Sequence, residues 1–178
     1  GYRWTDQGVV LQTVATDNYN ALDPCPVLDA SGGLWLGFGS YWSGIKIVRL
    51  DPAPARRTPP TTPVPGRPGR RYTPDSPVHG LAWNSTIEAC YLHRHGGWYY
   101  LFVNWGSCCQ GVTSTYNIRV GRSRAILGPY LDQAGVPLGD GGGTLVRSST
   151  GRFVWPGHAG IFEKDGTDWM SVHYYDAN

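Results

Sequence analysis

Three polar residues stand at the start of similar strand-forming segments, and two of them are carboxylates suited to acid–base catalysis. Asp23 begins DPCPVL, Glu88 begins EACYLH and His158 begins HAGIF. Each segment leads to a glycine turn and then to a tryptophan, which is the pattern of three copies of one unit. The tryptophans are Trp35, Trp98 and Trp169. Two carboxylates from different strands that point into one aromatic-lined opening suit proton transfer to a polar substrate.

The environments of the two carboxylates suggest different roles. Carboxylates that pack closely repel one another, so the pKa of one rises and that group stays protonated as a general acid. Glu88 lies between Ile87 and Ala89, a more apolar setting than that of Asp23, and is the better candidate for the acid. Glycoside hydrolysis needs such a pair. In the alternative interpretation Asp23, which precedes Pro24, only caps a turn, and His158 is a core residue instead of a ligand.

The segments that carry these residues are rich in aromatic and β-branched side chains, which suit pleated strands. The 178-residue chain has 8 Trp, 11 Tyr and 4 Phe, with 25 Gly and 14 Pro available for turns. We expect three strands within residues 20–50 and an outer strand of a preceding unit at residues 8–14. Repeated four-stranded units that open on a polar residue are typical of a β-propeller, whose innermost strands line a central channel. The expectation is therefore an all-β chain in which Asp23, Glu88 and His158 converge; a β-sandwich is the competing architecture.

Residues 52–77 differ from the rest of the chain in composition. They contain nine of the 14 prolines and five of the 15 basic residues. Such a segment buries too little apolar surface to offset the entropy lost on ordering, so we expect an extended or disordered surface loop. A basic interaction tail is the alternative interpretation.

Charge, hydropathy and cysteine spacing exclude several other classes. The net charge is +2 and the arginines are concentrated in that one loop, whereas a nucleic-acid-binding face needs basic residues spread along it. No apolar run is long enough to cross a membrane, and the first residues, GYRWTD, do not read as a signal peptide. The four cysteines do not show paired metal-ligand spacing. Cys108 and Cys109 are expected either as a vicinal disulfide or as two free thiols, and Cys25 and Cys90 as buried thiols.

Six motifs occur in an order that resembles glycoside hydrolase family 43, nearest to its endo-1,5-α-L-arabinanases. The motifs are NALDP (20–24), GSYWSGIK (39–46), IEACY (87–91), YYLFVNW (99–105), STYNIRVGRS (114–123) and GHAGI (157–161). The resemblance implies a secreted, monomeric five-bladed β-propeller that hydrolyses arabinan or arabino-oligosaccharides with inversion. It implies that residues 1–178 are a fragment of one catalytic domain: the end of blade 2, blades 3 and 4, and the start of blade 5.

The resemblance also implies roles for individual residues. Glu88 would protonate the leaving glycosidic oxygen, and Asp23 would modulate the pKa of that acid and orient the sugar. Ser40 and Asn20 would line the sugar subsite next to the cleaved bond, and His158 would help to hold a metal ion, usually calcium, in the central channel. Two further side chains are expected as walls of the cleft. They are Trp105 and Tyr116.

One member of the catalytic set is not matched. The family's general base is an aspartate in the first blade, and neither Asp6 nor Asp17 has a suitable position to replace it. General acid–base groups contribute roughly 10²–10⁴-fold each. We therefore expect the isolated chain to be inactive or nearly so, and to associate through exposed sheet faces. The alternatives are a non-catalytic carbohydrate-binding propeller segment, and an arabinofuranosidase or β-xylosidase of the same family.

Overall fold

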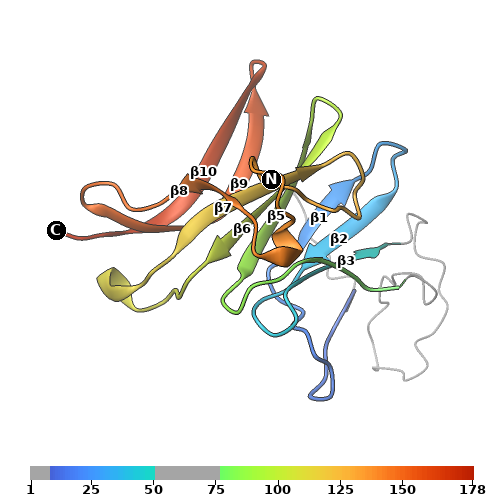
Figure 1. Ribbon diagram of the computed structural model, residues 1–178, viewed down its shortest axis with the longest axis horizontal. Coiled ribbons are helices and arrows are strands. Elements are labelled where there is room, and N and C mark those ends of the chain that lie inside the picture. The colour runs from blue at the N-terminus through green and yellow to red at the C-terminus, as the bar shows by residue number, and fades with distance from the viewer. Residues whose placement is uncertain (1–8, 51–76) are drawn as a thin grey trace, which may run out of the picture.

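The structure, a computed structural model, describes residues 9–50 and 77–178, which form three antiparallel sheets (Figure 1). The first sheet contains β1 (Cys25–Leu28), β2 (Leu34–Phe38), β3 (Ile45–Arg49) and β4 (His79–Ala82). The second contains β5 (Glu88–His95), β6 (Trp98–Trp105), β7 (Asn117–Ser123) and β8 (Thr144–Arg147). The third contains β9 (Phe153–Lys164) and β10 (Thr167–Asp176).

Strands follow one another in chain order within each sheet, so neighbouring strands are joined by turns. The β5–β6 turn has Gly96 and Gly97 at φ of 56° and 76°, and the β9–β10 turn has Asp165 and Gly166 at 54° and 74°. Two-residue hairpin loops favour such left-handed pairs because their twist matches that of the strands, and glycine and aspartate accept this conformation. Both turns were expected from the sequence.

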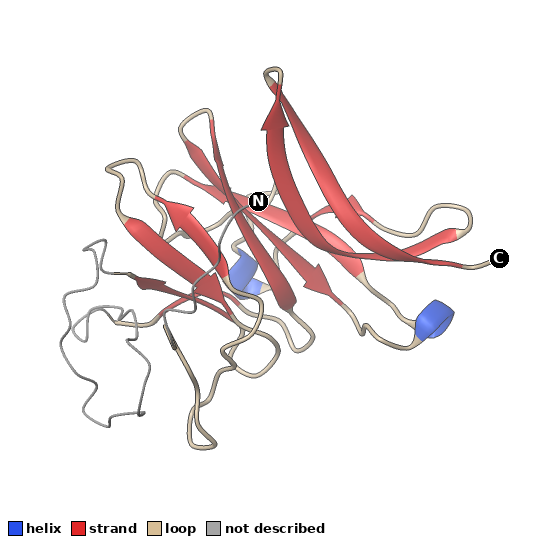
Figure 2. Cartoon of the chain, turned by 180° about the vertical axis from the view of Figure 1, so that it is seen from behind, coloured by secondary structure: helices blue, strands red, loops and turns tan. Residues whose placement is uncertain are grey.

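The three sheets stack face to face, as Figure 2 shows from behind. The main core lies between the first and second sheets. It includes Ile45, Ile47, Cys90, Leu101 and Val103, all fully buried. A smaller cluster of Phe102, Ile118 and Ala159 joins the second sheet to the third. The innermost strands β1, β5 and β9 lie side by side, which places the starts of β1 and β5 close to the middle of β9.

Four-stranded meanders stacked in this way are the units of a β-propeller, so the all-β prediction is confirmed and a two-sheet sandwich is not what forms. The two helical turns, η1 (Gly111–Thr113) and η2 (Leu138–Asp140), are each three residues long. In the described part of the chain, no helix is long and apolar enough to cross a membrane.

Three expectations about the strands need correction. Residues 9–14 form no strand, although a strand was predicted there. Conversely, β4 and β8 were not predicted. Each has four residues and lies at the end of its sheet, where one neighbouring strand supplies its pairing. The Pro/Arg-rich segment therefore connects β3 to β4 within one sheet and does not separate two units. The loop predicted at residues 52–77 lies, except for Pro77, outside the described residues.

Candidate active site

Three residues with left-handed backbone, two of them in β-bulges, place the candidate catalytic residues. Asp23, Ala89 and His158 have φ of 55°, 56° and 46°, which is unusual for residues other than glycine. In β5 and β9 the register shows the extra residue: Glu88 pairs with Asn104 and Tyr91 with Phe102, while Gly157 pairs with His173 and Gly160 with Ser171. Bulges redirect side chains and occur often beside active sites. Here they direct side chains from the starts of β1 and β5 and from the middle of β9 toward one pocket.

The bulges also correct the repeat alignment that the sequence suggested. Asp23, Ala89 and His158 share this left-handed backbone, so Glu88 lies one residue before the position that matches Asp23 and not at it. His158 lies inside β9, not at its beginning. The alignment was wrong by one residue because a bulge adds a residue to a strand without changing the types of residue found there.

Nine residues line a pocket of about 210 Å³ at this point. They are Asp23, Glu88, Ala89, Cys108, Cys109, Tyr116, His158, His173 and Tyr175. The predicted convergence of Asp23, Glu88 and His158 is therefore what the structure shows. A larger cavity of about 380 Å³ lies along the second sheet, but Asp132 is the single carboxylate in its lining. The smaller pocket is the better candidate because it combines paired carboxylates with polar groups.

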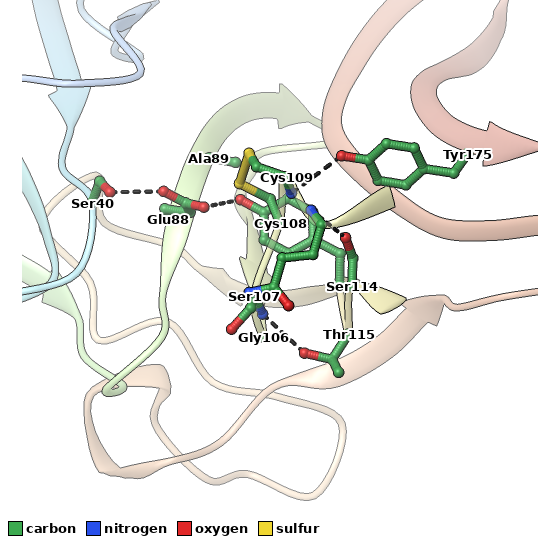
Figure 3. Close-up of a disulfide and its surroundings, with 12 residues drawn as sticks. Ser40, Glu88, Ala89, Gly106, Ser107, Cys108, Cys109, Ser114, Thr115 and Tyr175 are labelled. Atoms are coloured by element: carbon green, nitrogen blue, oxygen red, sulfur yellow. Dashed lines mark hydrogen bonds between the residues drawn. A yellow bond between two sulfur atoms is a disulfide. The ribbon is translucent and has the colours of Figure 1, made fainter. Parts of the chain in front are cut away.

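Glu88 accepts two hydroxyl hydrogen bonds, one on each carboxylate oxygen. Ser40 Oγ donates to Oε2 at 2.7 Å, and the hydroxyl of Tyr116 donates to Oε1 (Figure 3). The pKa of Tyr116 is strongly raised, first by burial and then by its bond to Glu88. Tyr116 is therefore a neutral phenol and a hydrogen-bond donor at neutral pH.

Asp23 lies next to this acid and contacts the residue that follows it. Its Oδ2 accepts the backbone N–H of Ala89 at 2.9 Å. The bond ties the first sheet to the bulge of the second and keeps the two carboxylates on one side of the pocket. Asn20 supports the arrangement from further out, since its amide donates to the carbonyl of Ser40 at 2.8 Å.

Trp105 does not take the position expected of a cleft wall. It does not line the pocket; it packs, partly buried, against the main core. The guanidinium of Arg119, its neighbour on β7, lies 4.2 Å from the centre of the indole ring. The cation–π contact and the core packing explain why an aromatic residue occupies the end of β6.

The pocket wall opposite Glu88 contains a disulfide between the adjacent residues Cys108 and Cys109, which decides between the two alternatives for this pair (Figure 3). The N–H of Cys109 donates to the hydroxyl of Tyr175 at 3.1 Å. Cys25 and Cys90 are free and buried, as predicted, and burial raises the pKa of both thiols. Sequence reasoning missed His173 and Tyr175 as lining residues, because nothing in β10 alone shows which face turns inward.

A calcium ion beside His158 would need oxygen donors, since calcium takes six to eight of them. The adjacent lining residue is another imidazole, His173, whose pKa is lowered by burial and then by His158. The described side chains thus do not build an oxygen-lined calcium site here, and no catalytic step below uses calcium. A grouping of His93, His95 and Asp168 with metal-compatible spacing lies elsewhere in the described residues.

The comparison with known families settles what kind of chain carries this pocket. The family model of glycosyl hydrolases family 43 matches residues 2–178. The chain belongs to this family. An extracellular exo-α-(1→5)-L-arabinofuranosidase of Cellvibrio japonicus is 38% identical over 183 residues, covering 99% of this chain and 50% of that protein. An extracellular endo-α-(1→5)-L-arabinanase of Bacillus subtilis is 38% identical over 175 residues, covering 98% and 49%.

Solved structures of family 43 arabinanases share the fold. The Cellvibrio cellulosa α-L-arabinanase complexed with arabinohexaose superposes with a TM-score of 0.84 at 34% identity, covering 99% of this chain and 56% of that chain. A family 43 endo-arabinanase of Bacillus licheniformis gives a TM-score of 0.78 at 34% identity, covering 97% and 59%. The chain spans about half the length of the curated relatives that it matches.

Proposed function

We propose that this chain supplies the general-acid side of the active site of an inverting glycoside hydrolase that cleaves α-1,5-linked arabinan. The observation that carries the proposal is Glu88 at the pocket, with a hydroxyl on each carboxylate oxygen and Asp23 beside it. The two curated relatives are named as an exo-α-(1→5)-L-arabinofuranosidase and an endo-α-(1→5)-L-arabinanase, and one structural relative is a complex with arabinohexaose.

The hydrogen bonds support a specific role for Glu88. As general acid it transfers its proton to the glycosidic oxygen, the bond from that oxygen to the anomeric carbon breaks, and the leaving sugar departs as an alcohol. Negative charge then develops on Glu88. Ser40 and Tyr116 already point hydroxyls at the two oxygens that receive it, so the conjugate base is stabilised without reorganisation. Asp23 assists the acid and orients the sugar, and Asn20 holds Ser40 in place.

Water activation is assigned to a further carboxylate. In the described lining of the pocket, the carboxylates are Asp23 and Glu88, and both lie on the acid side. Inversion needs a base on the opposite face of the sugar, with room for a water molecule between. We assign the base to a residue outside the described ones, and the three sheets to blades 3, 4 and 5 of a five-bladed propeller. The isolated 178-residue chain is then expected to be inactive or nearly so.

Secretion and a monomeric full-length enzyme belong to the same proposal. The first rests on two curated relatives described as extracellular. The second rests on the family resemblance alone, and the calcium ion that the resemblance also implies is left out because the side chains around His158 do not fit it. One of those relatives is named as exo-acting and the other as endo-acting at the same 38% identity, so identity does not separate the two modes.

A second candidate function is carbohydrate binding without hydrolysis. It is favoured by one observation, that the described pocket lining offers no third carboxylate to serve as base. Arabinofuranosidase or β-xylosidase activity is a variation of the first proposal with the same acid and a different sugar.

The test uses the polypeptide that contains this chain at its natural length, with debranched arabinan as substrate. ¹H NMR of the first products is expected to show the inverted β-anomer. Glu88→Gln is expected to reduce the rate by roughly 10²–10⁴-fold while arabinohexaose binding persists. Asp140→Asn, at an exposed carboxylate of η2, is the matched control and should act as the parent.

Three results would decide against parts of the proposal. A first-formed α-anomer would overturn the inverting mechanism. Full activity in Glu88→Gln would overturn the assignment of the acid. Arabinohexaose binding by the parent without any hydrolysis would favour the carbohydrate-binding candidate.

A further inference from the structure

Two histidines and an aspartate meet where the β5–β6 and β9–β10 hairpins lie side by side. His93 Nε2 is 3.2 Å, and His95 Nδ1 is 3.0 Å, from the same oxygen, Asp168 Oδ2. The three ligand atoms all lie within 4.8 Å of one another. His93 and His95 are two residues apart in β5, so both side chains leave the same face of the strand.

This cluster is separate from the arabinan pocket. Glu88 is the first residue of β5 and His95 is the last. At about 3.3 Å per residue the two ends of the strand are roughly 23 Å apart. His93 and His95 lie at the end of β5 that leads into the β5–β6 turn, and Asp168 lies just after the β9–β10 turn, so the cluster lies at the hairpin ends of the second and third sheets. It therefore serves neither proton transfer nor sugar binding at Glu88.

The donor set and its spacing suit a late first-row divalent metal. Zinc is bound by imidazole nitrogen and carboxylate oxygen at about 2.0–2.2 Å, and tetrahedral geometry then separates neighbouring ligand atoms by about 3.3 Å. The two measured separations, 3.2 and 3.0 Å, are close to this value. Calcium and magnesium prefer oxygen donors alone, so two imidazoles select against them.

A second observation points independently to a cation. Glu163 on β9 is directly opposite Asp168 on β10 in the sheet register. Side chains of opposite residues share one face with Cβ atoms about 4.5–5.5 Å apart, and like charges there are destabilising. A bound divalent cation removes this repulsion.

We propose that His93, His95 and Asp168 bind one Zn²⁺ ion or a metal of similar preference. Glu163 or water completes the shell. The three ligands come from two different sheets, β5 in the second and β10 in the third. The ion therefore joins the third sheet to the second at their outer ends, where the small cluster around Phe102 does not reach. The site acts as a clamp between sheets and not as a catalytic metal.

The test is isothermal titration of the untagged, EDTA-treated chain with Zn²⁺. The expected result is one ion per chain, a raised melting temperature with Zn²⁺, and tetrahedral absorption bands when Co²⁺ replaces it. His95→Gln and Asp168→Asn should each weaken binding at least tenfold and abolish the thermal shift. His79→Gln on β4 and Asp165→Asn in the β9–β10 turn are the matched controls and should bind as the parent does.

The proposed site would be overturned if Zn²⁺ did not bind, if both ligand variants bound it as the parent does, or if Ca²⁺ gave an equal response. Loss of Zn²⁺ binding in His173→Gln would also overturn it, because the ion would then lie in the arabinan pocket. His95 is exposed, with 57% of its side chain accessible, so His95→Gln is expected to fold, and circular dichroism checks this. Because the readout is metal binding, failure here leaves the proposed hydrolysis untouched.

Discussion

Ser40 and Tyr116 contact different oxygens of Glu88, so the loss of either hydroxyl removes support for the charge that appears during proton transfer. Tyr116→Phe keeps the buried ring and deletes one bond. Bonds to charged groups contribute about 1.5–3 kcal/mol, which corresponds to a fall in kcat of about 10- to 100-fold. KM should change little, because the bond matters most in the transition state. Steady-state kinetics on arabinohexaose with the natural-length polypeptide measure both.

Tyr174→Phe is the control for this substitution, since Tyr174 is 49% exposed and does not line the pocket. It should leave both constants unchanged. An unaltered kcat in Tyr116→Phe would show that the hydroxyl serves packing alone.

At the residue scale, the sequence predicted that Asp23, Glu88 and His158 converge, as they do in the pocket lining, and it missed other residues of that lining. Asp23 and Glu88 were singled out because each stands at the start of a strand-forming segment of the repeat. His173 and Tyr175 were missed because their inward orientation depends on the register shifts in β10, which side-chain types do not encode. Trp105 was misplaced because an aromatic residue at a strand end serves a core as readily as a cleft.

Among the elements, the bulge of β9 depends on one buried side chain. Asn104 is fully buried on β6. Its Oδ1 accepts the N–H of His158 at 2.9 Å, and its amide donates to the carbonyls of Pro156 at 3.0 Å and Asn117 at 3.2 Å. A single amide thus connects the second and third sheets next to the pocket.

Asn104→Ala would leave those three backbone groups without their partner. Each unsatisfied buried group costs about 1–3 kcal/mol, so the unfolding free energy should fall by about 3 kcal/mol. Urea denaturation followed by tryptophan fluorescence measures the change. Asn178→Ala at the exposed end of the chain is the control and should be neutral. A loss below 1 kcal/mol in Asn104→Ala would mean that water replaces the amide.

The β1–β2 turn gives a prediction about pH. Asp29 Oδ1 accepts bonds from Ser31 and Gly33, and Oδ2 accepts the indole N–H of Trp35 at 2.8 Å. The bonds from Ser31 and then Trp35 hold the pKa of Asp29 well below its ordinary value of 3.8. The unfolded chain therefore takes up this proton first. The contribution to stability is complete above about pH 4 and is lost as the pH falls below 3.8.

Asp29→Asn should lower the free energy of unfolding at pH 7. When the urea midpoint is measured from pH 6 to pH 2, it should fall less steeply in this variant than in the parent. Asp165→Asn, in a turn where no such bonds hold the carboxylate among the described residues, should retain the parent's acid limb. A parallel acid limb in Asp29→Asn and the parent would assign the pH dependence to other carboxylates.

At the element scale, strands with a clear aromatic or β-branched run were recognised, as β1, β2, β3, β5 and β6 show. The short edge strands β4 and β8 were not recognised. Their pairing is decided by the neighbouring strand, which supplies the ladder of hydrogen bonds.

For the whole molecule, the stacking of three sheets leaves part of the third sheet uncovered. Phe162 and Trp169 are directly opposite one another in the β9–β10 register, and they are 52% and 54% exposed. Phe153 and Tyr174 add a second exposed aromatic contact on the same hairpin. Exposed apolar groups clustered on a sheet mark a surface that packs against something else. In a propeller, neighbouring sheets cover one another face to face, as the first two do here.

This uncovered sheet leads to a prediction about the isolated 178-residue chain. It should associate, with a sedimentation coefficient that rises with protein concentration, because association removes the aromatic side chains from water. Replacing Phe162 and Trp169 together by threonine keeps the β-propensity of both positions and should reduce association. Val112→Thr removes an equally exposed apolar side chain from η1 and is the control. A parent that stays monomeric at all concentrations, or a double variant that associates as the parent does, would show that the hairpin surface is not what drives association.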